Sequence, residues 1–218
     1  MAGRVMARSG KARKPTKKGG VMYELKTARA KIEGVAPLLM SNPRMVDEND
    51  ELKIQIKAIT DKNHKKRTKA DMEKKRRLEY LGSIYENKTD GVYLPCSNIE
   101  ACIRDGARTK NKGKTIESGL SVSPNCVKLI YDGPKTGKAL YKNGRFVDYR
   151  SVVIGKSRVM RMRPRFDNWA LEFEIMAVAE IVALDDVETY LSTAGIEKGL
   201  GDFRPKFGRF IVKEFEIV

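Results

Sequence analysis

The chain has 218 residues and a formal net charge of +16, with 44 Lys and Arg residues against 28 Asp and Glu residues. Its hydrophobic fraction of 41% is sufficient for a folded core, and the length suits one domain with an insertion or two small domains. No stretch approaches the roughly 18 consecutive apolar residues of a membrane span, and the basic N-terminus lacks the apolar segment of a secretory signal.

Three cysteines, none of them in a CxxC pair, argue against a disulfide framework and against a cysteine-rich metal site. We therefore expect reduced, mostly buried thiols and a cytoplasmic protein, in a bacterial host or a phage-infected cell. No cofactor and no metal are expected.

The excess charge is concentrated in two segments. Residues 1–20 contain seven basic residues and no acid, and residues 53–77 contain eleven basic residues and three acids. The rest of the chain is close to neutral. Such segments neutralise phosphates and release counterions, which gives sequence-independent affinity for nucleic acid. A solvated helix face with a tail that only aids solubility is one alternative. An anionic membrane is another, although residues 1–20 lack the bulky apolar face of a membrane-surface helix.

Three elements are predicted before residue 86. Residues 1–20 read as a disordered basic arm, and alternating apolar residues predict a strand within 21–35. Residues 47–85 read as a basic helical insertion, with an amphipathic segment first and a second helix that begins at the capping pattern of Thr68 and Asp71. We take residues 21–218 as one domain that carries this insertion.

The remainder alternates strands, helices and turns. The expected order is a strand at 92–94, a helix at 99–107 capped by Ser97 or Asn98, a charged loop at 108–118, strands at 126–131 and 147–154, a basic stretch at 158–165, a strand at 169–177, a helix at 184–194, a glycine-rich loop at 195–201 and a strand at 210–218. This order predicts an α+β fold with an antiparallel sheet and helices on one face. A βαββαβ ferredoxin-like core, similar to an RRM, fits it well.

A strand that stops at Pro95 and passes directly into a helix is the first candidate binding element. Free backbone N–H groups at such a helix start can receive a phosphate, and Arg104 emerges later on the same helix. Ordinary strand-to-helix capping is the alternative.

The second candidate is the glycine-rich stretch 195–210, which interleaves glycines with Arg204, Lys206 and Arg209. Glycines permit positive φ and close backbone approach. The stretch matches neither a P-loop nor a dinucleotide fingerprint, and a flexible surface loop is the alternative.

The third candidate is the basic stretch 158–165. On a strand, Arg161, Arg163 and Arg165 would share one face while Met160 and Met162 point to the other. An arginine row matches a phosphate backbone. The alternative is an edge strand kept soluble by its charge.

Enzymatic chemistry has little support in the sequence. His64 is the only histidine and lies in a charged run without apolar neighbours, whereas nucleophilic triads need a positioned base. Gly155-Lys156-Ser157 has Arg150 where a P-loop needs its first glycine. The acidic cluster at 47–51 and the pair Asp185 and Asp186 lack both a nearby histidine and the spacing of a calcium loop. We therefore expect no catalytic residues.

Three short motifs together resemble the RAMP superfamily, in particular the backbone subunits of CRISPR RNA-guided complexes. They are Ala36-Pro37-Leu38-Leu39-Met40, the stretch from Leu94-Pro95-Cys96-Ser97 to Ile103-Arg104, and Gly199-Leu200-Gly201 through Phe207-Gly208-Arg209-Phe210. The resemblance covers residues 21–45, 92–108 and 195–218. It implies a ferredoxin-like core and a variable helical insert at 47–85 that touches the bound strand or the next subunit.

The chain is shorter than typical backbone subunits, and it equally resembles a phage or mobile-element relative that works outside any CRISPR complex. Its single histidine, outside any motif, argues against the RNA-processing members that cut with a histidine.

The sequence thus predicts a non-catalytic protein that binds single-stranded nucleic acid, RNA in preference to DNA. It would assemble side by side along the strand into a filament or ring, with other subunits of a ribonucleoprotein as further partners and no membrane. A phage structural or assembly protein is the rival. The sheet is the expected platform, and Tyr93, Phe203 and Phe207 are candidate stacking residues. The predicted contact residues are Lys62, Lys65, Lys66, Arg67, Lys69, Lys74, Lys75, Arg76, Arg77, Ser97, Asn98, Arg104, Arg108, Lys110, Lys112, Lys114, Arg161, Arg163, Arg165, Arg204, Lys206 and Arg209.

Overall fold

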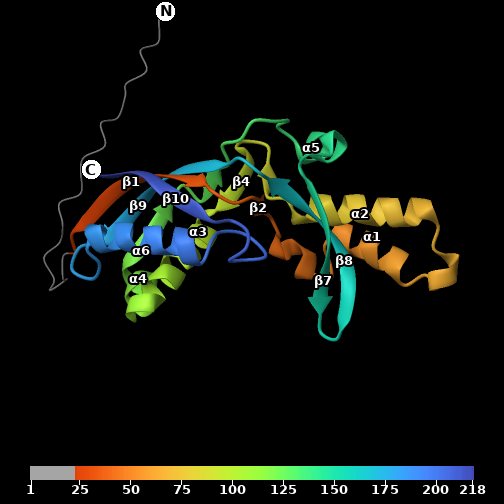
Figure 1. Ribbon diagram of the computed structural model, residues 1–218, viewed down its shortest axis with the longest axis horizontal. Coiled ribbons are helices and arrows are strands. Elements are labelled where there is room, and N and C mark those ends of the chain that lie inside the picture. The colour runs from red at the N-terminus through yellow and green to blue at the C-terminus, as the bar shows by residue number, and fades with distance from the viewer. Residues whose placement is uncertain (1–22) are drawn as a thin grey trace, which may run out of the picture.

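The computed structural model describes residues 23–218, so the expected arm at 1–20 lies outside the described residues. A four-stranded antiparallel sheet of order β10-β1-β9-β5 forms the body (Figure 1). In chain order the body contains β1 (Leu25–Gly34), α3 (Cys96–Ala107), β5 (Leu120–Ser123), β9 (Ala170–Val178), α6 (Leu184–Glu197) and β10 (Phe210–Ile217). This is the βαββαβ arrangement, and the predicted ferredoxin-like fold class is confirmed.

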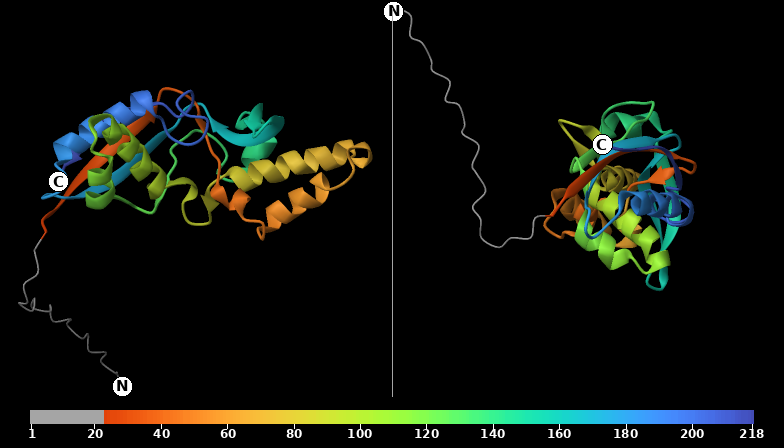
Figure 2. Two further views of the ribbon diagram at one scale, coloured as in Figure 1. Left: turned by 90° about the horizontal axis from the view of Figure 1, so that it is seen from below. Right: turned by 90° about the vertical axis from the view of Figure 1, so that its left-hand side faces the viewer.

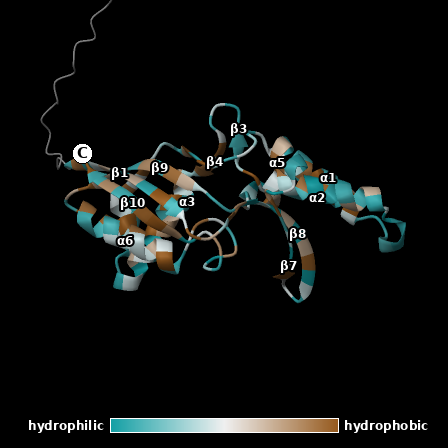
Figure 3. Cartoon of the chain, turned by 45° about the horizontal axis from the view of Figure 1, so that its top comes forward, coloured by the Kyte–Doolittle hydropathy of each residue, from teal (hydrophilic) through white to brown (hydrophobic). Residues whose placement is uncertain are grey.

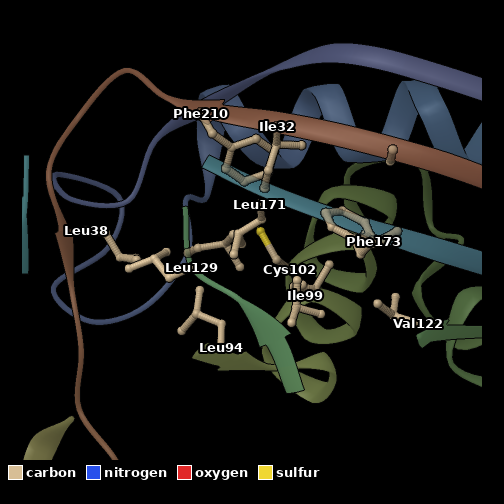
Figure 4. Packing of buried hydrophobic residues seen from close by; sticks show 14 of the residues in the cluster. Ile32, Leu38, Leu94, Ile99, Cys102, Val122, Leu129, Leu171, Phe173 and Phe210 are labelled. Atoms are coloured by element: carbon tan, nitrogen blue, oxygen red, sulfur yellow. The ribbon is translucent and has the colours of Figure 1, made fainter. Parts of the chain in front are cut away.

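Alternation along the strands builds the core. Ala28, Ala30 and Ile32 of β1 are buried, as are Leu171 and Phe173 of β9, while the residues between them point away. This inner face meets the apolar sides of α3 and α6, and Cys102 and Ile99 of α3 lie among the sheet residues in Figure 4. Each large apolar side chain buried in this way stabilises the fold by about 1.5–3 kcal/mol.

Two insertions extend the molecule away from this body (Figure 2). The first, between β1 and α3, contains β2 (Leu38–Leu39), a 3-10 helix (Pro43–Val46), α1 (Glu51–Thr60), a 3-10 helix (His64–Lys66), α2 (Lys69–Ser83), β3 (Glu86–Asn87) and β4 (Gly91–Pro95). The second, between β5 and β9, contains β6 (Cys126–Lys128), α5 (Gly137–Asn143), β7 (Val147–Ile154) and β8 (Ser157–Phe166). The β7–β8 hairpin pairs with β2 in a second sheet.

The helical character expected for 47–85 is present in α1 and α2. Asp50 caps α1, and Thr68 and Asp71 form the predicted capping box of α2. The second helix ends at Ser83, two residues before the end of the predicted insertion.

The start of α3 differs from the prediction. The helix begins at Cys96 with Pro95 at the N-cap position and no side-chain cap, so the expectation that Ser97 or Asn98 caps it is wrong. Pro95 lacks an N–H and has φ −61°, which leads the chain straight from β4 into the helix. Ser97 and Asn98 are already in its first turn.

The charged loop expected at 108–118 is also wrong, because the segment is mostly helical. A 3-10 helix (Arg108–Lys110) is followed by α4 (Gly113–Gly119), which packs through Ile116. The strand β5 that follows was not predicted, since four residues give too short a pattern. Within residues 23–218, no helix combines the length and apolarity needed to cross a bilayer.

The glycine-rich loop begins later than predicted and is anchored to the body. Gly195 is part of α6, where it packs against Phe210. The N–H of Gly208 donates to Pro37 O at 2.8 Å, and the N–H of Asp202 donates to Leu39 O at 2.9 Å. Gly201 has φ +73°, and a Cβ there would lie 2.3 Å from Leu39 O. The loop therefore needs glycine for close packing against the 36–40 bend.

Cys102 completes this junction, because its thiol donates to Gly199 O at 3.3 Å. The three motifs that carried the family resemblance thus meet at one place in the structure. Burial raises the pKa of the Cys102 thiol to about 12, and a buried, protonated thiol is a poor nucleophile.

We expect a thiol-reactive disulfide reagent at pH 8 to modify Cys96 and Cys126, both half-buried, while Cys102 reacts only after the addition of denaturant. Peptide mass spectrometry of the modified protein measures this order. Rapid modification of Cys102 in the native protein would contradict its burial.

Candidate nucleic-acid interface

The open face of the body sheet does not have the charge of a nucleic-acid platform. Register places five glutamates on it against three basic residues, and no aromatic side chain among them. The basic residues are paired: Arg29 with Glu174 at 3.3 Å, Lys31 with Glu172 at 3.0 Å and Lys213 with Glu33 at 3.3 Å. The expectation that the sheet supplies the platform is therefore not supported.

Several basic residues of the first insertion have structural partners. Lys62 pairs with Asp71 at 2.7 Å, and the Arg67 guanidinium donates to the backbone carbonyls of Lys62 and Thr60. The guanidinium of Arg76 lies 4.7 Å from the centre of the Tyr149 ring. These contacts hold the α1–α2 connection and the β7–β8 hairpin in place.

Lys75 belongs to a buried ion cluster. The Glu79 carboxylate, only 3% exposed, accepts from Lys75 Nζ and from Arg161 Nη1, each at 3.0 Å. Since Glu79 is on α2 and Arg161 is on β8, the cluster fastens the two elements together.

The exposed basic residues of α2 line a groove against α5. Its volume is about 550 Å³, and its lining includes Lys74, Arg77, Lys138, Lys142 and Tyr141. Glu73 is its one acidic residue. Lys74, Arg77, Lys138 and Lys142 form no ion pair within residues 23–218. Four unpaired cations in one concave site suit a chain of phosphates better than any other part of the described structure. We call this site the α2–α5 groove.

A second hollow of about 600 Å³ continues this site along α2. Tyr141 and Glu73 line both hollows, and Arg67, Lys69 and Arg76 line the second. The Tyr141 ring packs edge-on against Tyr80, with 5.3 Å between the ring centres. This packing holds the Tyr141 ring between the two hollows. In the ribbon of Figure 3, hydrophilic residues predominate along α2.

The arginine row has the predicted geometry and a different set of partners. Met162 and Phe166 of β8 are buried while the arginines point to the opposite face. Each arginine faces a carboxylate: Arg161 with Glu79, Arg163 with Asp202 at 2.8 Å, and Arg165 with Asp167 at 2.6 Å. Arg163 and Asp202 join β8 to the glycine-rich loop. The three arginines therefore form ion pairs within the fold. Their contact with nucleic acid stays a prediction.

A mixed-charge groove brings together two predicted clusters that are distant in sequence. Asp105 of α3 pairs with Arg108 at 2.7 Å and with Arg204 at 3.4 Å. The groove, of about 930 Å³, also includes Lys198, Glu197, Asp202 and Phe203 in its lining. Acids and bases are equal in number there, so it is less suited to phosphates than the α2–α5 groove.

Other predicted contacts are dispersed. Arg104 pairs with Glu117 at 3.2 Å, and Asn98 is half-buried beside the hydroxyl of Tyr85, whose pKa is raised by burial. The predicted residues not yet described are exposed: Lys65, Lys66, Ser97, Lys110, Lys112, Lys114, Lys206 and Arg209. They are accessible to solvent, but they lie on different elements and loops of the chain.

Of the three candidate stacking residues, one has an accessible ring. Phe203 is 41% exposed, whereas Phe207 is buried beneath the Arg150 guanidinium at 4.3 Å. Tyr93 packs at a tilt on Tyr85, with 5.9 Å between ring centres. Phe203 is thus the most exposed of the three, with the Arg150 guanidinium 5.3 Å from the centre of its ring.

The sequence reading missed α5, which supplies half of the α2–α5 groove. Signals for it were present: Thr136 caps the helix by accepting from Ala139 N, and Gly144 ends it with φ +79°. Lys138 and Lys142 are four residues apart and so share a face. A seven-residue helix after a turn is too short for a clear apolar period.

No protein-family model and no curated protein sequence matches this chain. Among solved structures, a chain in the cryo-EM structure of the Type III-B Cmr-beta complex bound to cognate target RNA matches with a TM-score of 0.50 and 12% identity. The match covers 89% of this chain and 61% of that chain, so this chain spans less than two thirds of its neighbour's length. This chain therefore has a fold similar to that of a chain in this RNA-bound complex, which confirms at the level of the fold the resemblance that the three short motifs indicated.

Proposed function

We propose that this protein is a non-catalytic, single-stranded RNA-binding subunit of a ribonucleoprotein, in which copies assemble side by side along the RNA. The α2–α5 groove carries the proposal, because four cations without ion-pair partners in the described chain line one concave site. The fold neighbour is part of a complex bound to RNA, which favours RNA over DNA as the ligand. The exposed Phe203 and the lysines at 110–114 extend the contact along the strand.

A salt titration tests the electrostatic basis of binding. We expect a fluorescent single-stranded RNA to bind at 50 mM salt and to lose about 300-fold or more in affinity by 200 mM, if six or more phosphates are neutralised. Fluorescence anisotropy measures this loss. Single-stranded DNA of the same sequence is the comparison, and tighter binding of DNA would overturn the choice of RNA. Absence of binding at low salt would overturn the proposed function.

Electron micrographs with and without a long single strand test the assembly. We expect filaments or rings only when RNA is present. Assembly without nucleic acid, together with no RNA binding, would instead favour the phage structural or assembly protein. Labelled RNA incubated with the protein, with and without Mg²⁺, should stay intact, and cutting would contradict the non-catalytic assignment.

A further inference from the structure

Among residues 23–218, no helix or strand packs on one face of the β10-β1-β9-β5 sheet. The helices α3, α4 and α6 all lie on the opposite side in Figure 1. The side chains of Glu172 and Glu214 on the open face are 57% and 72% exposed. A hollow of about 680 Å³ follows this face, and its lining includes Glu172, Glu174, Glu214 and Glu216. The chain as a whole has a net charge of +16, whereas on this face acidic residues outnumber basic ones.

The bases on the open face are already engaged. Lys31 lies 3.0 Å from Glu172 and 4.0 Å from Glu214, and the Glu172 contact raises the pKa of Lys31. Arg29 and Lys213 are paired as described above. Glu216 has no ion-pair partner within the described residues. The face therefore retains a surplus of negative charge next to a hollow that a chain segment could fill.

The sequence contains a matching segment directly before this sheet. Residues 1–20 carry seven basic residues and no acid, and they lead into β1, a central strand of the same sheet. Twenty extended residues reach about 66 Å. The face measures roughly 15 Å across its four strands and 30 Å along β1. We propose that residues 1–20 lie on the open face of their own chain's sheet and pair with its glutamates.

The arm of the same chain is a better occupant than the basic insertion of a second copy. A tethered segment meets the face at millimolar effective concentration, far above the concentration of another copy in dilute solution. The insertion also carries its own acids, such as Asp71 and Glu73, which reduce its attraction to the face. The arm carries none.

Limited trypsin digestion of the full chain tests this assignment without any nucleic acid. The test variant carries Glu172→Gln, Glu174→Gln, Glu214→Gln and Glu216→Gln. At low salt we expect the arm of this variant to be cut three- to tenfold faster than that of the wild type, because each lost ion pair contributes modestly. The matched control carries Glu48→Gln, Glu117→Gln, Glu188→Gln and Glu197→Gln, which are exposed elsewhere. We expect its arm to be cut at the wild-type rate. At about 0.5 M salt all three rates should converge.

Equal cleavage of the open-face variant and the wild type at low salt would overturn the proposal. So would faster cleavage of the control variant to the same extent, since overall charge would then be the cause. Protection that weakens on tenfold dilution of the wild type would assign the face to another copy and overturn the same-chain assignment. RNA is absent throughout, so these outcomes are separate from failure of the proposed function.

Discussion

Replacing Lys74, Arg77, Lys138 and Lys142 together by glutamine is expected to weaken single-stranded RNA binding by 10²- to 10³-fold at about 0.1 M salt. Each phosphate contact to a single strand releases about 0.7 of a counterion, so four lost contacts remove nearly three powers of ten in affinity at this salt concentration. The dependence of log affinity on log salt should become shallower by about three. Fluorescence anisotropy over a salt series measures both quantities.

A matched variant separates the groove from overall charge. Replacing Lys26, Lys88, Lys128 and Lys156 by glutamine also removes four positive charges, from exposed positions outside the α2–α5 groove. We expect this control to lose less than tenfold in affinity and to keep its salt dependence. If both variants lost affinity equally, binding would follow net charge, and the groove would have no special role. Circular dichroism of both variants verifies that they fold.

The sequence predicted β1 and the capping box of α2 because both depend on local signals. The strand within 21–35 shows its alternation directly, and the capping box at Thr68 and Asp71 is set by residues three apart. The amino-acid composition of each segment likewise identified the basic segments. It could not show which basic residues lack an ion-pair partner in the folded protein.

The pairing of the basic residues depends on contacts between distant parts of the chain. Arg161 meets Glu79 across 82 positions, and Arg163 meets Asp202 only because the glycine-rich loop folds back beside β8. The sequence therefore predicted correctly that the three arginines share one face of a strand. It could not predict the carboxylates with which they pair. For the same reason Lys138 and Lys142 of α5, absent from the predicted contacts, join Lys74 and Arg77 in one groove.

Replacing Glu79 by alanine is expected to lower the free energy of unfolding by about 3 kcal/mol. Removing one partner of a buried ion pair typically costs 3–5 kcal/mol, because the other charge stays buried without compensation. Lys75 is only 19% exposed and would bear this cost, whereas Arg161 is 36% exposed and can reach water, which places the effect at the lower end. Chemical denaturation followed by circular dichroism measures the change.

A triple variant distinguishes a lost ion cluster from lost packing. Leucine at positions 75, 79 and 161 removes all three charges and retains apolar volume, so we expect stability near the wild type. If Glu79→Ala cost less than about 1 kcal/mol, water would be screening the cluster, and it would not fasten α2 to β8.

The part of the fold that Glu79→Ala destabilises matters for function as much as the size of the change in unfolding free energy. At 100° per residue, Lys74 and Arg77 lie on the side of α2 roughly opposite Lys75 and Glu79, so one side of the helix is fastened while the other faces the groove. Loss of Glu79 should therefore let α2 open before the body unfolds, with faster hydrogen exchange of its amides than of those in β1. RNA affinity should fall in proportion to the open fraction, although no groove residue has changed. Equal exchange in α2 and β1 would mean that the insertion and the body unfold as one unit, and groove geometry would then not depend on the cluster.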